Sequence, residues 1–156
     1  MSLSRLYDTI TAISTPLGTS ALAMVRISGE DAIGIVAGRV SEPHRLLVLR
    51  SGTSLHTTIL TPADGALDDV VISVHRAPRS YTGEDLVEIT SHGSPVIAET
   101  IQALLIAGGA RSAEPGEFSR RALMHGKIAL ADAEQISART HATSAVSYTH
   151  LTLPTI

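Results

Sequence analysis

The segment RSYTGEDLVEITSHGSP, residues 79–95, joins a polar loop, a short strand that carries a carboxylate and the start of a helix. Side chains alternate through this strand, so Val87 and Ile89 point to one face and Glu88 points to the other. A charged side chain in the middle of a strand is costly if it is buried without a partner. Glu88 is therefore a candidate binding residue, and the alternative is that it simply faces water.

Strand and helix patterns extend in both directions from this segment. A turn at 15–20 predicts that the two strands beside it form a hairpin. Ser28 suits the N-cap of a helix that ends near Gly38, and Pro95 suits the first position of a helix that ends at Gly108. Alternating apolar residues predict strands at 9–14, 21–28, 45–50, 54–60, 67–75 and 86–91, with a short edge strand at 110–113.

The pattern changes near residue 123. A turn over 114–119 leads into 120–124, and 130–146 has no glycine or proline and carries apolar residues at helical spacing. Residues 147–156 are rich in threonine and do not continue this helix. We expect a sheet domain over 1–123, the first part of a helical domain over 124–146, and an unrelated or disordered tail over 147–156.

Composition limits the function classes. The chain has 156 residues and 44% hydrophobic content, enough to bury the core of one domain of ordinary size. One Phe, three Tyr and no Trp leave few platforms for stacking bases, and the formal net charge of −3 lacks the basic excess of a nucleic-acid surface. We therefore expect no direct RNA binding by this segment.

The chain contains no cysteine, which excludes disulfides, thiolate metal sites and a cysteine nucleophile and fits a reducing compartment. Arg5 and Asp8 interrupt any apolar run at the start, and no window approaches the roughly 20 apolar residues of a membrane helix. We expect a cytoplasmic location without membrane contact.

Arg26, Lys127 and His92 are further candidates for chemistry. Arg26 ends a predicted strand beside a helix start and could hold a carboxylate, or it could pair with a surface acid. Lys127 is the single lysine of the sequence and lies between two helical segments, so its ammonium could reach the sheet or merely solvate a helix end. His92 stands beside helix amides as a possible anion contact or proton donor, or as a structural histidine.

Two kinds of site are not predicted. The phosphate loop G-x-x-x-x-G-K-[ST] is absent, because Arg121 occupies the position of its first glycine and Ile128 follows Lys127. The histidines show no spacing typical of a metal site. We expect neither GTP binding by this chain itself nor a structural metal.

Taken in order, six motifs resemble the N-terminal portion of the tRNA-modification GTPases known as TrmE or MnmE. The resemblance covers residues 8 to 146. The motifs are DTITA at 8–12, VRISG at 25–29, SYTGED at 80–85, EITSHG at 88–93, EPGEFSRRA at 114–122 and HGK at 125–127.

This resemblance implies an α+β fold, in which a mixed β-sheet folate-binding domain similar to that of aminomethyltransferases precedes the start of a helical domain. It implies a homodimer that binds 5-formyl-tetrahydrofolate or a related one-carbon tetrahydrofolate, with Arg26, Glu88 and Lys127 at the folate-contact positions. A carboxylate suits the pterin edge, and two cations suit the formyl oxygen or the glutamate tail.

The resemblance also implies that the intact protein modifies the wobble uridine of tRNA together with a flavoprotein partner. This chain lacks the GTPase domain, so tRNA contact is expected only through the full-length complex. Two alternatives remain: a dimerisation scaffold that binds no ligand, and a stand-alone folate-dependent enzyme of the aminomethyltransferase type.

Overall fold

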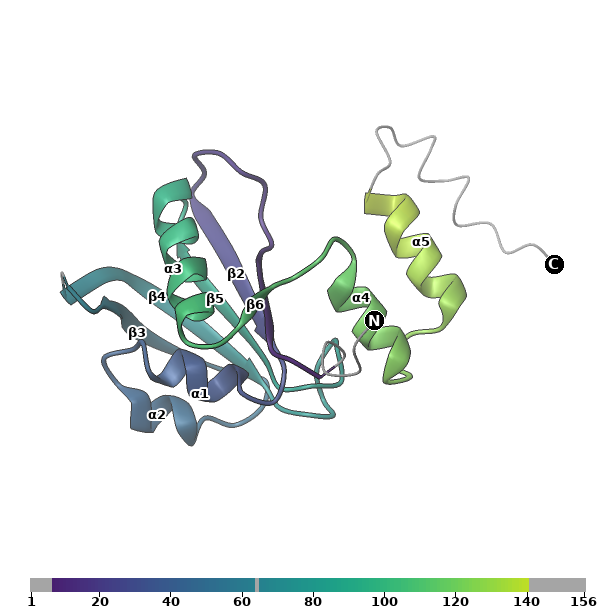
Figure 1. The fold of residues 1–156 in the computed structure, drawn as a ribbon, viewed down its shortest axis with the longest axis horizontal. Coiled ribbons are helices and arrows are strands. Elements are labelled where there is room, and N and C mark those ends of the chain that lie inside the picture. Colours follow the sequence, from purple (N-terminus) through teal and green to yellow (C-terminus); the bar gives the residue numbers. More distant parts are fainter. Residues whose placement is uncertain (1–6, 64, 141–156) are drawn as a thin grey trace.

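The computed structural model describes residues 7–63 and 65–140. In this part of the chain, six strands form one sheet in the order β3-β4-β5-β2-β1-β6 (Figure 1). β6 pairs in parallel with β1 and the other pairs are antiparallel, so the sheet is mixed. The strands are β1 (Ile10–Ile13), β2 (Leu22–Ser28), β3 (Thr53–Thr61), β4 (Gly65–His75), β5 (Leu86–His92) and β6 (Arg111–Ser112).

Five helices accompany the sheet in the described ranges, and the predicted α+β class with a mixed sheet is confirmed. Three of them pack on one face of the sheet, whereas α4 and α5 lie beyond its end (Figure 1). The helices are α1 (Ala32–Ala37), α2 (Pro43–Leu47), α3 (Pro95–Ala107), α4 (Glu117–Met124) and α5 (Leu130–Thr140).

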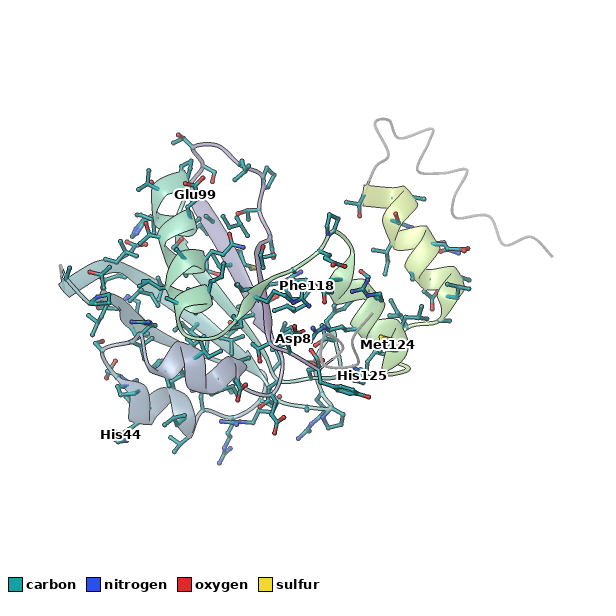
Figure 2. All side chains as sticks on the ribbon, viewed as in Figure 1. Asp8, His44, Glu99, Phe118, Met124 and His125 are labelled. Atoms are coloured by element: carbon teal, nitrogen blue, oxygen red, sulfur yellow. The ribbon has the colours of Figure 1, made fainter. Side chains whose placement is uncertain are left out.

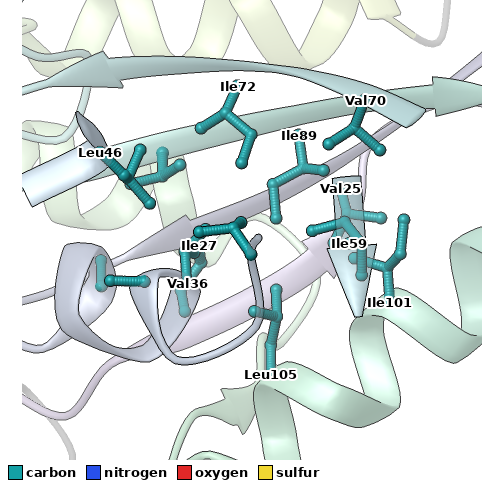
Figure 3. Packing of buried hydrophobic residues seen from close by; sticks show 14 of the residues in the cluster. Val25, Ile27, Val36, Leu46, Ile59, Val70, Ile72, Ile89, Ile101 and Leu105 are labelled. Atoms are coloured by element: carbon teal, nitrogen blue, oxygen red, sulfur yellow. The ribbon is translucent and has the colours of Figure 1, made fainter. Parts of the chain in front are cut away.

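The core lies between the sheet and α1, α2 and α3 (Figure 3). Alternate residues of each central strand enter it, as strand geometry requires: Val87 and Ile89 of β5 are fully buried, as are Val25 and Ile27 of β2. Their neighbours Glu88 and Arg26 therefore lie on the opposite face of the sheet. The alternation predicted for Glu88 is confirmed.

Several predicted elements are confirmed and others are wrong. The hairpin of β1 and β2 and the edge strand β6 form as expected. The strand predicted at 45–50 is wrong, because Pro43 opens the short helix α2 and Leu46 turns into the core. A short apolar run such as Leu46 to Leu49 does not distinguish a strand from a helix by periodicity.

Helix starts also differ from the prediction. Asp31, without a side-chain cap bond, is the N-cap of α1, and Ser28 instead ends β2 with its hydroxyl bonded to Thr82 and Glu84. α4 begins at Glu117, inside the predicted turn. The described part of α5, Leu130–Thr140, agrees with the helix predicted over 130–146, and residues 141–146 lie outside the described residues. The predicted tail at 147–156 lies outside the described residues.

Candidate functional site

Arg26 and Glu88 form a pair on the sheet face that the core helices leave open. They are direct neighbours in the β2–β5 register, and Arg26 Nε donates to Glu88 Oε1 at 2.8 Å. The two side chains keep 37% and 21% of their surface exposed, so a ligand can reach both. The structure thus brings two of the three predicted contact residues together.

The pair leaves hydrogen-bonding capacity unused. Of the three side-chain nitrogens of Arg26, only Nε has a partner among residues 7–63 and 65–140, so the terminal amino groups remain available for an anion. Glu88 Oε2 lies 3.9 Å from His75 Nε2, beyond hydrogen-bonding distance, and can accept from a further donor. The pair can therefore hold an anion with one member and an N–H edge with the other.

Polar side chains continue on both sides of this pair. Ser73 of β4 is the register partner of Glu88, and its hydroxyl lies 2.8 Å from that of Ser54. His75, two residues further along β4, is on the same face and about one third exposed. Together with Arg26 and Glu88, these residues form a polar row across four strands.

Lys127 lies apart from this row. It follows the end of α4, and its Nζ donates to the carbonyl oxygen of Pro78 at 2.8 Å. Its aliphatic stem lies over Gly83, where an added Cβ would be 3.3 Å from Lys127 Cγ. Its predicted position between two helical segments is confirmed. Within one chain, no described contact joins Lys127 to Arg26 or Glu88.

His92 is held by a carboxylate. Asp68 accepts the His92 backbone N–H at 2.9 Å and lies 2.8 Å from the ring Nδ1, while 71% of the His92 side chain stays exposed. Since Asp68 is only 10% exposed, the pair fixes the imidazole at the end of β5. This arrangement matches the structural alternative for His92, whose ring stays largely exposed.

A second charged group lies where the sheet meets α4, around Asp8 (Figure 2). Arg121, 2% exposed, donates to Asp8 and Glu117 and reaches Glu84, while Arg111 donates to Asp8 and Glu117. We call Asp8, Glu84, Arg111, Glu117 and Arg121 the α4 charge cluster.

The α4 charge cluster shifts the ionisation of its members. Burial alone would raise the pKa of Glu117, but hydrogen bonds from Arg111 and the Glu114 amide outweigh it and lower that pKa to about 2. A hydrogen bond from Arg111 likewise lowers the pKa of Asp8. Hydrogen bonds to Asp8 and Glu117 raise the pKa of Arg111 further above its usual value.

Sequence reasoning placed Glu84 among the polar residues beside the Glu88 strand, but it did not assign His75, Ser73, Asp68 or the other members of the α4 charge cluster to a site. The alternation in 67–75 places Ser73 and His75 on the polar face, and they become neighbours of Glu88 once β4 and β5 are paired. No comparable signal exists for Asp8 and Arg121, because 113 residues separate them.

The described ranges bear on two further kinds of feature, metal-binding groups and membrane-spanning helices. There, no group of three or more histidine, aspartate and glutamate side chains is arranged to hold a metal ion. No helix in the same ranges has the length and apolar character needed to cross a membrane.

Comparisons with known proteins identify relatives of this chain. Residues 9–127 match the family described as GTP-binding protein TrmE N-terminus. A tRNA modification GTPase MnmE of Chlorobium phaeobacteroides is 47% identical over 145 residues, which is 90% of this chain and 30% of that protein. The protein of the same name from Streptococcus thermophilus is 46% identical over 136 residues, 87% of this chain and 29% of its own length.

A third relative, tRNA modification GTPase MnmE of Lactobacillus delbrueckii, is 47% identical over 131 residues, 83% of this chain and 28% of that protein. The chain therefore spans less than one third of the length of each of these relatives. The matched part includes Arg26, Glu88 and Lys127, which all lie within residues 9–127.

Proposed function

Because this chain belongs to the family of the GTP-binding protein TrmE N-terminus, we propose that it is the folate-binding, dimerising domain of a GTPase that modifies tRNA. The proposed ligand is 5-formyl-tetrahydrofolate or a related one-carbon tetrahydrofolate. When bound, such a ligand supplies a one-carbon unit. The part of this chain is to hold the ligand on the sheet face that carries Arg26 and Glu88.

The unused capacity of the Arg26–Glu88 pair is the observation that carries this proposal. Glu88 anchors Arg26 through Nε and Oε1, which keeps the guanidinium in place while its terminal amino groups can bind a carboxylate or formyl oxygen. Glu88 Oε2 can accept an N–H from the amino-pyrimidinone edge of a pterin. These donors and acceptors fit the proposed group.

A homodimer would complete this site. Leu22 and Val71 are 58% and 43% exposed and share the open face with Arg26, as the alternation of β2 and β4 requires. A second copy packed on this face would cover both apolar side chains and exclude water from the pair. We propose that Lys127 joins the ligand in the assembled dimer, since it does not contact the pair within one chain.

The activity of the full-length protein is a separate part of the proposal. In the relatives, more than two thirds of the length lies outside the matched part. We propose that the GTPase domain, the flavoprotein partner and the tRNA act through that remaining part, in the cytoplasm, while this domain holds the one-carbon donor for modification of the wobble uridine.

Titration calorimetry with 5-formyl-tetrahydrofolate tests the proposal on this chain. We expect saturable binding at one site per chain, and no comparable heat from p-aminobenzoylglutamate, which lacks the pterin. Light scattering in the same buffer should report a dimer. If neither heat nor a thermal shift is seen at high ligand concentration although the dimer forms, the domain is a dimerisation scaffold.

The scaffold is the second candidate function. It is favoured by the exposed apolar side chains Leu22 and Val71 on the open face, which a second copy would cover whether or not a ligand is bound. The two candidates therefore predict the same oligomeric state and differ only in the calorimetry.

A further inference from the structure

The position of Lys127 depends on the loop at 76–85. The Lys127 Nζ donates to Pro78 O at 2.8 Å, and its stem lies against Gly83. The same loop runs directly into β5, which carries Glu88. Any displacement of the loop therefore moves Pro78 and Gly83, which contact Lys127, relative to Glu88.

Three side chains of α4 and the residue after it fasten this loop. Arg121 donates to Glu84 at 3.1 Å, His125 Nδ1 donates to Thr82 O at 2.7 Å, and the hydroxyl of Ser119 lies 2.9 Å from that of Tyr81. Of these, the Arg121 contact is the ion pair, and its side chains are 2% (Arg121) and 12% (Glu84) exposed. Such a largely buried charged contact is little weakened by water and salt.

Arg121 also ties the loop to the start of the sheet. Its Nη1 donates to Asp8 O at 2.6 Å, and the Glu84 carboxylate that it holds accepts from Ser28 Oγ at 2.7 Å. Ser28 is two residues from Arg26 in β2. One guanidinium thus connects the helix that leads to Lys127 with the strands that carry Arg26 and Glu88.

Stability alone is a poor explanation for this buried arginine. Burying an ion network costs several kcal/mol of desolvation, and apolar replacements of the same shape are often equally stable. Within the described ranges, Arg121 Nε is buried without a hydrogen-bond partner, which adds a further penalty. With Nε unpaired, Nη1 donates to Asp8 O and Glu84, and Nη2 donates to Asp8 Oδ1 and Glu117.

We propose that Arg121 is a positioning residue, which sets the place of Lys127 relative to Glu88 by holding Glu84 and the 76–85 loop. Arg121 does not touch the ligand in this scheme, and the proposal rests on the assignment of Lys127 as a ligand contact. Arg111 belongs to the same cluster, but among the described residues its side chain hydrogen-bonds to Asp8, Glu117 and Ser112 and to no residue of the 76–85 loop except through the shared cluster, so it should not control the loop.

Arg121→Gln and Arg111→Gln form a matched pair for the test, since each removes one positive charge from the α4 charge cluster. Lys127 is the only lysine in the sequence, so NMR of ¹³C-lysine-labelled protein gives a signal that reports on Lys127 alone. This measurement does not require a bound ligand. We expect that Arg121→Gln shifts this signal toward that of a free lysine and lowers hydrogen-exchange protection at 82–85 about tenfold. Arg111→Gln should leave both observables close to wild type.

Glu84→Gln is the second variant, for the case that Arg121→Gln does not fold. It removes the charge of Glu84 from the loop, while Arg121 keeps its ion pairs with Asp8 and Glu117. We expect Glu84→Gln to reproduce the shift of the Lys127 signal. An unchanged Lys127 signal in the folded variants would overturn the proposal, and so would an equal change in Arg111→Gln, which would indicate general loosening.

The ligand titration separates this inference from the proposed function. If wild type binds 5-formyl-tetrahydrofolate, Arg121→Gln should weaken binding about tenfold and Arg111→Gln by no more than about twofold. If wild type binds no folate but the lysine signal responds as expected, the positioning of Lys127 by Arg121 stands and the folate assignment fails.

Discussion

Arg26 donates its Nε hydrogen to Glu88 Oε1 at 2.8 Å across the neighbouring strands β2 and β5, although 62 residues separate the two along the chain. The contact orients both side chains on the open face of the sheet, and among the described residues Arg26 Nη1, Arg26 Nη2 and Glu88 Oε2 have no hydrogen-bond partner. This relationship makes the open face of the sheet, rather than the helical layer, the proposed ligand surface.

Glu88→Gln tests the acceptor side of this pair. We expect the affinity for 5-formyl-tetrahydrofolate to fall by about 1 to 3 kcal/mol, because a charge-assisted hydrogen bond to the pterin edge is lost. Asp69→Asn is the control, since Asp69 is an exposed acid of β4 bonded to Thr58. Unchanged affinity in a calorimetric titration of Glu88→Gln would place Glu88 outside the ligand site.

Arg26→Lys tests the geometry of the donor side. A lysine keeps the charge but cannot hold Glu88 and present a second pair of donors at the same time, so ligand affinity should fall about tenfold or more. The free energy of unfolding should change by less than about 1 kcal/mol, because the pair is partly exposed. Urea unfolding provides that second value. A large loss of stability with unchanged affinity would contradict a binding role for Arg26.

The depressed pKa of Glu117 predicts loss of stability in acid. Its folded pKa of about 2 lies below the ordinary value of 4.5, so Glu117 stabilises the fold above pH 4.5. This contribution, on the order of 3 kcal/mol, is lost as the pH falls from 4.5 toward 2. Asp8, whose pKa is also lowered, acts in the same direction. Urea unfolding at pH 7, 4 and 3 measures the effect.

Glu117→Gln provides the comparison for this pH dependence. We expect a loss of about 3 to 5 kcal/mol at pH 7, because the buried Arg121 loses a counter-charge, and a flatter pH profile below pH 5. An equally steep profile in the variant would assign the acid sensitivity to other groups.

Gly83→Ala should disturb Lys127 through a direct contact. The added Cβ would lie 2.8 Å from His125 Cβ and 3.3 Å from Lys127 Cγ, so His125 and Lys127 must move. Gly52→Ala is a matched control, because Gly52 has φ +78° against +81° at Gly83 and no atom within 4 Å of the added Cβ. In both variants the free energy of unfolding should fall by about 1 to 2 kcal/mol, because alanine is strained at a positive φ. Only Gly83→Ala should shift the NMR signal of Lys127.

The exposed surface of α5 predicts that this helix is not stable by itself in this chain. No residue of α5 is buried, and a groove of about 510 Å³ between α4 and α5 is lined by Leu123 and Ile136 among others. In this chain alone, we expect the amides of α5 to exchange rapidly, as short helices without a packed face do. Slow exchange of α5 in this chain would contradict this prediction for the start of a helical domain.

The sequence was sufficient for the strands that carry the site. Alternation around Glu88 correctly predicted that Val87 and Ile89 share one face of the sheet and Glu88 lies on the other, because side chains in a strand alternate with a period of two. Turn residues correctly predicted the hairpin of β1 and β2.

Local sequence patterns could not predict which strands pair with one another. β2 pairs with β5 rather than with β3, and this long-range choice brings Arg26 to Glu88. Arg121 shows the same limit, since its partners Asp8 and Glu84 are brought to α4 only by the folded chain. Local patterns report which face a residue occupies, and tertiary packing decides what it meets there.

The order of elements along the chain gives Lys127 a mechanical role as well. It lies between Gly126, whose φ is +66°, and the start of α5, so it belongs to the joint at which the outer helix leaves the sheet domain. A rotation of α5 imposed by the rest of a larger assembly would be transmitted along the backbone to this joint first. Only residues 128 and 129 separate Lys127 from α5, so a residue proposed to hold the small molecule lies close in the chain to the helix that such a rotation would move.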